Sequence, residues 1–239
     1  MSIIIPCKNE KNNIETIIKR TPSFGASQEF IFVEGHSTDG TGAEINRVIR
    51  AYPDKTIKLF TQTNTGKNDA VYLGLAHSIG DIVIIFDSDL TIMPEDMIKF
   101  YAALQEGQAG LICGSRLILP MEKGAMPVLN LIGNKLSALY LSWLLGIRLT
   151  DVLGGIKALF RKDYNAICVQ PDSREPLDPW GDIDLLLGAS ALKLKVLEIP
   201  IYYKCREYGI SQIRRFQDSI LILAVFMRAF WRVKVKKWL

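Results

Sequence analysis

Two aspartates that follow a strongly apolar run are the residues best suited to chemistry. Asp87 and Asp89 end the segment 82–89, with Ser88 between them. In an extended chain, positions i and i+2 project to the same side, so both carboxylates can reach one cation while Ser88 points away. Hard divalent cations prefer one or two carboxylates together with phosphate oxygens and water. The spacing therefore predicts a Mg²⁺ or Mn²⁺ site, with a solvated turn as the alternative.

Polar segments also follow the preceding apolar runs. Residues 6–10 (PCKNE) come after the first run, and residues 34–41 (EGHSTDGT) after the second. A third segment, 64–70, contains Gly66-Lys67 and opens a helical pattern, where backbone N–H groups and an ammonium can meet phosphate. It lacks the spacing of a Walker A loop. The three polar segments indicate a ligand site, and the third could bind phosphate.

The elements that must position these residues alternate along the N-terminal half. Apolar runs predict strands at 2–6, 29–34, 56–61, 82–87 and 109–115, and helical spacing predicts helices at 12–20, 41–51, 69–78 and 128–147. This β-α-β order predicts an α/β fold with a mostly parallel sheet and right-handed crossovers. Ligands of such sheets gather beyond the carboxyl ends of the strands, so we expect the polar segments to share one edge.

Length and composition are those of a folded enzyme-sized body. The chain has 239 residues, of which 49% are hydrophobic and 23% charged, and this excludes collagen-like and wholly disordered classes. The four cysteines lie far apart, without the close pairs of zinc sites or redox dithiols. The N-terminal residues lack a signal-peptide pattern. We therefore expect reduced thiols and a cytoplasmic protein.

Basic residues gather near the C-terminus. Residues 204–239 contain nine Lys and Arg against two acidic residues, a local charge of +7, whereas the chain as a whole carries +4. This distribution favours an anionic surface partner over nucleic acid. Residues 219–239 mix aromatic, aliphatic and basic side chains, a pattern typical of a helix lying on an anionic membrane; packing on the domain is the alternative. The polar residues within 128–147 favour a buried or interfacial helix over a bilayer span.

Several ordered motifs resemble a known family across nearly the whole chain. SIIIPCKNEKNNI, VEGHSTDGT and GKNDAVYLGLAHSIGDIVIIFDSDLTIMPED are similar to the nucleotide-sugar domain of family 2 glycosyltransferases. CGSRL, GNKLSALYLSWLLGIRLTDVLGGIKALFRKD and EIPIYYKCREYGIS resemble the polyprenyl-phosphate sugar transferases, the dolichyl-phosphate mannose synthase-like branch. The resemblance implies the glycosyltransferase A-type fold. It implies a catalytic domain at 1–210, with a nucleotide-sugar half at about 1–115 and an acceptor half at about 116–210, followed by a basic amphipathic helix at 211–239.

The resemblance also implies roles for individual residues. Asp87, Ser88 and Asp89 would form the metal motif on the donor, with Asp89 the more direct ligand, and Lys67 would lie nearby. Asp182 stands where inverting relatives place a catalytic carboxylate, with Asp184 as its rival; either can instead be a favourable charge at a helix start. The nucleotide base and ribose would be contacted by Pro6, Asn9, Glu10, Glu34 and Ser37. Phosphate or acceptor contacts would come from Arg116, Asn134 and Arg206.

These observations together predict a metal-dependent, inverting glycosyltransferase that uses a nucleotide diphosphate sugar. The expected acceptor is a polyprenyl phosphate or another membrane-linked glycan precursor, handled at the inner face of the cytoplasmic membrane. A sugar hydroxyl acceptor would need a carboxylate such as Asp182 to accept its proton, whereas a phosphate is already largely ionised. A soluble transferase, a nucleotidyltransferase and a non-catalytic nucleotide-sugar-binding scaffold are the alternatives. The sequence leaves a homo-oligomer open.

Overall fold

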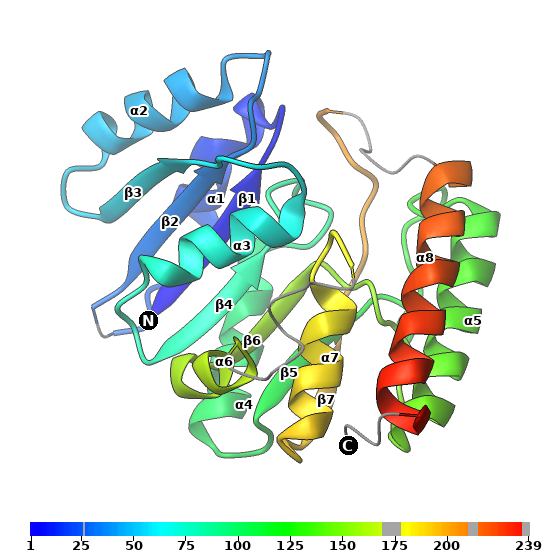
Figure 1. The fold of residues 1–239 in the computed structure, drawn as a ribbon. Helices are drawn as coiled ribbons and strands as arrows, with labels where there is room; N and C mark the ends of the chain where they lie inside the picture. The colour runs from blue at the N-terminus through cyan, green and yellow to red at the C-terminus, as the bar shows by residue number, and fades with distance from the viewer. Residues whose placement is uncertain (26, 169–177, 210–214, 236–239) are drawn as a thin grey trace.

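The computed structural model describes residues 1–25, 27–168, 178–209 and 215–235 (Figure 1). A single seven-stranded sheet runs through this part of the chain, in the order β3-β2-β1-β4-β6-β5-β7. The strands are β1 (Ser2–Cys7), β2 (Glu29–Glu34), β3 (Thr56–Thr61), β4 (Ile82–Phe86), β5 (Leu111–Ser115), β6 (Ile156–Phe160) and β7 (Val196–Pro200). The strands predicted at 29–34 and 56–61 are confirmed residue for residue, and the other three within two residues at either end.

One strand runs against the others. β6 is antiparallel to both β4 and β5, while every other neighbouring pair is parallel. The parallel strands β1, β2 and β4 end at the same edge, because Cys7 pairs with Glu34 and Ile4 with Ile85. The expected α/β fold with a mostly parallel sheet is confirmed, and β6 starts at the edge where β4 ends.

Helices cover both faces of the sheet. Side chains alternate along β1, so that Ile3 and Ile5 enter one core and Ile4 enters the other. Buried residues of α1 (Ile14–Arg20), α2 (Thr41–Ala51) and α4 (Met97–Gln105) line the first core. Those of α3 (Lys67–Ala76), α6 (Arg161–Cys168) and α7 (Asp182–Ala191) line the second. The result is three layers, with α3 and α7 at the front of Figure 1.

Two helices lie side by side at one end of the second core (Figure 1). They are α5 (Val128–Leu145) and α8 (Arg215–Phe230), and a π-helical turn, Trp231–Val235, continues α8. Tyr140 stacks on Phe226 with ring centroids 4.7 Å apart, and its hydroxyl donates to the Phe226 carbonyl at 2.9 Å. Within the segment 211–239, α8 and its π-helical continuation cover 215–235, and residues 211–214 and 236–239 lie outside the described residues.

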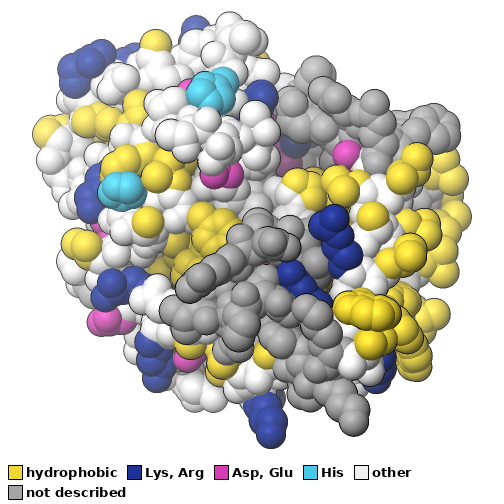
Figure 2. All heavy atoms as spheres, viewed as in Figure 1, with side chains coloured by type: hydrophobic (Ala, Val, Ile, Leu, Met, Phe, Trp, Pro, Cys, Tyr) yellow, Lys and Arg dark blue, Asp and Glu magenta, His cyan; other side chains and the backbone are white. Residues whose placement is uncertain are grey.

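The two helices turn apolar side chains outward. We call this the α5/α8 surface, and Figure 2 shows it as hydrophobic side chains gathered over these helices. Among the described residues, α5 is the one helix long and apolar enough to cross a membrane by length and composition, and 28% of it is buried. The exposed large apolar residues of the surface are Val128, Leu129, Ile132, Leu136, Leu139 and Trp143 on α5, and Ile220, Leu221, Leu223, Met227, Phe230, Trp231 and Val235 on α8 and its continuation.

Candidate active site

The two aspartates of the predicted metal motif lie at the carboxyl end of β4. Asp87 follows the strand directly, and its backbone N–H donates to the Gly155 carbonyl at 3.0 Å, at the start of β6. Its carboxylate pairs with the Lys67 ammonium at 2.6 Å, at the first residue of α3. The Ser88 hydroxyl turns the other way and donates to the Pro6 carbonyl at 2.9 Å. Ser88 therefore points away from the two carboxylates as expected, but Ser88 and Asp89 lie in a turn after β4 and not in an extended segment.

Asp89 is held by a different cation. Its Oδ2 accepts from the Arg206 guanidinium at 2.6 Å, and its Oδ1 accepts from the Thr91 hydroxyl at 2.7 Å. Arg206 also pairs with the buried Glu10, so it joins the ends of β1 and β4 from the segment that follows β7. Burial raises the pKa of Glu10 to about 7, although the Arg206 charge opposes that shift. A carboxylate and a guanidinium are thus brought together from opposite ends of the chain.

The oxygen ligands at this edge suit a hard divalent cation. Asp87 and Asp89 offer carboxylate oxygens, and Mg²⁺ is commonly bound by one or two carboxylates plus substrate phosphates. Within the described ranges there is no group of three or more His, Cys, Asp or Glu side chains that could hold a metal by itself. The residues therefore fit a cation whose remaining ligands come from a diphosphate, and they do not form a self-contained protein cage.

The turns after β1 and β2 interlock. The Ser37 backbone N–H donates to the Glu34 carboxylate, the Asn9 N–H donates to the Ser37 hydroxyl at 2.9 Å, and the Thr38 N–H donates to Asn9 Oδ1 at 2.8 Å. Residues predicted to contact the base and ribose therefore lie on adjoining turns. Three non-glycine residues of this edge have left-handed backbone: Asn9 with φ 57°, His36 with φ 58° and Leu90 with φ 54°. Such angles are uncommon outside glycine and carry strain.

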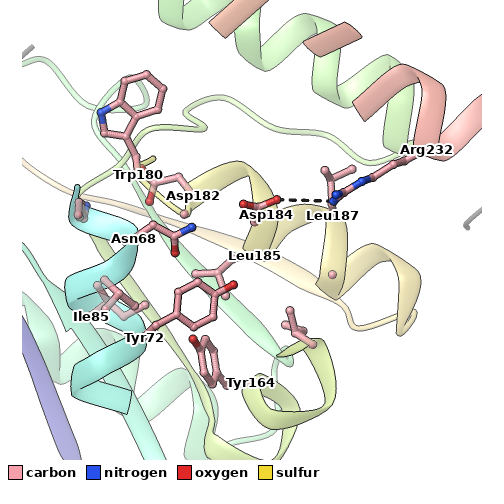
Figure 3. A pocket seen from close by; sticks show the side chains of 15 residues that line it. Asn68, Tyr72, Ile85, Tyr164, Trp180, Asp182, Asp184, Leu185, Leu187 and Arg232 are labelled. Atoms are coloured by element: carbon pink, nitrogen blue, oxygen red, sulfur yellow. Dashed lines mark ion pairs between the residues drawn. The ribbon is translucent and has the colours of Figure 1, made fainter. Parts of the chain in front are cut away.

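The two rival carboxylates of α7 point in different directions, as Figure 3 shows. Asp184 lies 4.0 Å from Arg232 in the π-helical turn after α8. Asp182 is buried and pairs with the Lys157 ammonium of β6. Burial works against the charged form of Lys67, but the carboxylates of Asp182 and Asp87 outweigh it and raise the Lys67 pKa. Asp182 therefore belongs to the charge cluster of the metal motif, and Asp184 faces the C-terminal helix.

Two of the three predicted phosphate contacts meet on a buried aspartate. Arg116 binds Asp151 through Nε at 2.6 Å and Nη2 at 2.9 Å, and Asn134 of α5 donates to Asp151 at 2.7 Å. The Arg116 guanidinium lies over the Tyr203 ring, 5.1 Å from its centroid. The pKa of Asp151 is lowered: burial opposes the shift, but Arg116 and Asn134 outweigh it. Of the three, Arg206 is the one in contact with the metal motif.

Sequence reasoning missed two members of this arrangement. Lys157 stands within an apolar run, which gives no local signal for a charge, and its partner Asp182 is 25 residues away. Asp151 follows a helix whose buried face carries Asn134, and the signal available was an aspartate beside an apolar helix. Both depend on contacts between elements far apart in sequence.

The fold and this edge define a class of protein. A mostly parallel sheet flanked by helices is the fold of A-type nucleotide-sugar glycosyltransferases, and in this chain paired carboxylates with cationic side chains on them follow β4. The chain belongs to the family described as "Glycosyl transferase family 2", whose model matches residues 2–168. The protein is therefore a glycosyltransferase.

Curated relatives agree with the expected branch of the family. The chain is 26% identical over 238 residues to polyprenol monophosphomannose synthase of Mycolicibacterium smegmatis, covering 97% of this chain and 86% of the relative. It is 23% identical over 218 residues to undecaprenyl-phosphate 4-deoxy-4-formamido-L-arabinose transferase of Salmonella paratyphi B, covering 89% of this chain and 62% of that protein. The resemblance to the polyprenyl-phosphate sugar transferases is confirmed.

Solved structures share the fold. Glucosyl-3-phosphoglycerate synthase from Mycobacterium tuberculosis, in complex with Mn²⁺, UDP and glucosyl-3-phosphoglycerate, matches with a TM-score of 0.68 and 19% identity, covering 95% of this chain and 79% of that one. Mannosyltransferase PcManGT from Pyrobaculum calidifontis, in complex with GDP-Man and Mn²⁺, matches with a TM-score of 0.62 and 17% identity, covering 95% and 63%. The expected glycosyltransferase A-type fold is confirmed.

Proposed function

We propose that this glycosyltransferase is metal-dependent, inverts the anomeric centre, and moves a sugar from a nucleotide diphosphate sugar to a polyprenyl phosphate. The observation that carries the proposal is the convergence of Lys67 and Arg206 on the carboxylates of Asp87 and Asp89, at 2.6 Å in both cases. Cations and carboxylates interleaved in this way match a diphosphate bound through a divalent ion. The Mn²⁺-bound fold relatives and the names of the curated relatives support the same donor and acceptor classes.

The reaction makes one bond and breaks one. A phosphate oxygen of the acceptor attacks the anomeric carbon, and the bond from that carbon to the diphosphate breaks, so that the diphosphate leaves with the electron pair. Mg²⁺ or Mn²⁺ held by Asp87 and Asp89 would supply electrostatic stabilisation of the leaving diphosphate. Lys67 and Arg206 orient the same group and offset its charge in a partly dry site, where preorganised charges act strongly.

The donor's nucleoside is assigned to the interlocked turns after β1 and β2. Pro6, Asn9 and Ser37 belong to these segments. Glu10 and Glu34 belong to them as well, and both carboxylates are buried. A carboxylate in this position can accept hydrogen bonds from ribose hydroxyls or base N–H groups. We assign Arg116 and Asn134 to the acceptor side, where their shared partner Asp151 fixes both.

Two features support a polyprenyl phosphate acceptor: the charge of a phosphate group and the apolar α5/α8 surface. A phosphate acceptor needs orientation more than a base, because its second pKa is about 6. The α5/α8 surface lies beside the second core. The segment that forms α8 and its π-helical continuation also contains basic residues, among them Arg228 and Lys234. Aromatic and aliphatic groups with neighbouring basic residues suit the interface of an anionic membrane. This favours a cytoplasmic enzyme at the inner face of the membrane.

A second function rests on Asp182. If the acceptor were a sugar hydroxyl, this buried carboxylate beside Asp87 would be the group that accepts the proton. The two functions differ in what Asp182 must do. If turnover requires the Asp182 carboxylate, the hydroxyl acceptor is favoured. If turnover requires only that the Asp182 charge is neutralised, the phosphate acceptor is favoured.

The test measures transfer from a panel of UDP- and GDP-sugars, with and without a short polyprenyl phosphate, for the wild type and Asp89→Ala. We expect turnover that requires Mg²⁺ or Mn²⁺, rises with the lipid phosphate and is lost in the variant. Asp81→Ala is the matched control, because this aspartate precedes β4 at the opposite edge and its side chain is 99% exposed. Metal-independent turnover in Asp89→Ala would contradict the proposal, as would equal loss in both variants.

A further inference from the structure

Lys157 is a buried lysine in the middle of the sheet. Its side chain is 3% exposed, and its residue on β6 pairs with Ile85 of β4 on one side and Cys113 of β5 on the other. The ammonium donates to the Asp182 carboxylate and, at 2.7 Å, to the Gly154 carbonyl. Burying an ion pair removes the hydration of both groups, so the pair by itself is weak evidence for stability. The pair does, however, connect β6 to the start of α7.

One partner of Lys157 belongs to a segment that contacts the metal motif, and the other lines a cavity with Lys67, which pairs with that motif. Gly154 precedes Gly155, whose carbonyl accepts the Asp87 N–H at 3.0 Å. Gly155 also faces the Asp87 carboxylate so closely that a Cβ there would lie 2.4 Å from Oδ2. Asp182 begins α7 and lines one cavity together with Lys67, the lysine that pairs with Asp87. Lys157 therefore fixes the positions of two segments near Asp87: Gly154-Gly155 and the start of α7.

The charge of Asp182 would oppose the substrates if it stood alone. The site must admit a diphosphate and, on the proposed function, a second phosphate, and a carboxylate beside Asp87 repels both. Such repulsion is strong where water is excluded. Lys157 offsets the charge from the sheet side, where its ammonium is buried, whereas Lys67 lies at the edge, 20% exposed. Lys67 is thus left to meet the donor.

We propose that Lys157 is a positioning residue that neutralises and orients Asp182, so that an anionic acceptor phosphate can enter beside Asp87. The inference rests on the proposed polyprenyl phosphate acceptor. It gives Asp182 the role of a charge partner for Lys157 and assigns it no proton transfer, so a variant that removes both charges keeps a working site.

The test compares Lys157→Met, Asp182→Asn and the double variant, with Lys162→Met of α6 as a control that removes the same charge from the surface. Each is assayed for thermal unfolding, for Mn²⁺ binding in the presence of UDP, and for transfer to a short polyprenyl phosphate. We expect Lys157→Met to raise the acceptor KM by at least about tenfold and to leave kcat less affected. The double variant should recover the KM and the unfolding temperature, whereas either single variant leaves one buried charge unpaired.

The double variant keeps the test decisive even where Lys157→Met alone does not fold. A double variant with normal unfolding, Mn²⁺ binding and acceptor KM, but with kcat lowered by roughly 10²-fold or more, would make Asp182 a proton acceptor and overturn the inference. A folded Lys157→Met with an unchanged acceptor KM would overturn it as well. Absence of any transfer to polyprenyl phosphate by the wild type would instead overturn the proposed function on which it rests.

Discussion

Gly155→Ala should damage the metal site and leave the fold intact. The new Cβ would lie 2.4 Å from Oδ2 of Asp87 and 3.0 Å from its Cγ. The three nearest atoms, including Cβ at 3.2 Å, all belong to the Asp87 side chain, so the conflict is relieved mainly by moving that side chain. Oδ2 must move by 0.6 Å to reach 3.0 Å from the new atom, and by 1.0 Å to reach ordinary contact at 3.4 Å. Gly155 does not have the left-handed backbone that would itself disfavour alanine.

This displacement is large on the scale of metal coordination, because Mg²⁺ holds its ligands at about 2.0–2.1 Å in near-octahedral geometry. A misplacement of about 1 Å can lower the rate by roughly 10²-fold. We therefore expect kcat/KM to fall by that order, about 2.7 kcal/mol at about 1.36 kcal/mol per decade. The concentration of Mg²⁺ or Mn²⁺ that gives half-maximal rate should rise in parallel.

The assay is a metal titration of sugar transfer, together with thermal unfolding. Gly133→Ala of α5 is the matched control, since nothing lies within 4 Å of its added methyl group. That change should stabilise the helix by up to about 1 kcal/mol and leave the metal dependence unchanged. If Gly155→Ala has the wild-type metal dependence and rate, the assignment of Asp87 to the metal is refuted.

Three further predictions concern the charges and the outer surface. Arg206→Met removes the cation from Asp89, and we expect the donor KM to rise roughly tenfold, since a hydrogen bond to a charged group contributes about 1.5–3 kcal/mol; steady-state kinetics with varied donor checks this. Asp151→Asn should lower the free energy of unfolding by about 3 kcal/mol at pH 7, because Arg116 loses its buried partner. The folded pKa of Asp151 is lowered, so this stabilisation is present above the usual pKa of 3.8 and is lost as pH falls through the folded value; wild type and variant should converge there in urea unfolding. Leu139→Asn and Leu223→Asn, 68% and 62% exposed, should each weaken binding to anionic vesicles by about tenfold without changing the unfolding temperature, as vesicle co-sedimentation would show.

The sequence was most informative where structure is local. The strands that end in polar residues could be predicted because an apolar run followed by polar residues needs no knowledge of distant contacts. The sheet edge then followed from chain order, because successive parallel strands end at the same side. Asp87, Lys67 and Glu10 were assigned to one site on that basis, and the structure brings these residues together at one edge of the sheet.

Prediction failed where an element depends on distant partners. β6 is five residues long, carries a buried lysine and runs antiparallel between strands that precede it in the chain. Its periodicity therefore gives no strand signal of its own. β7 ends at Pro200, which pairs with Ser115 at the outer side of the sheet. The helix predicted at 128–147 is found as α5, but its hydrophobic pattern does not show that apolar residues lie on both its faces: Ala138, Leu141 and Leu144 are buried beside Asn134 and Ser137, and other apolar residues face outward.

The left-handed backbone at Asn9, His36 and Leu90 has a consequence for engineering. Each residue sits at a turn after β1, β2 or β4, and glycine would adopt the same angle without steric cost. Replacing Leu90 by glycine would relieve its backbone strain but also loosen the turn beside Asp89, whereas asparagine tolerates this angle and the Asn9 amide also accepts from the Thr38 N–H. Selection for heat resistance alone would therefore favour the change at Leu90, and the resulting enzyme would be more stable but slower. A search for more stable variants should therefore leave these three residues unchanged.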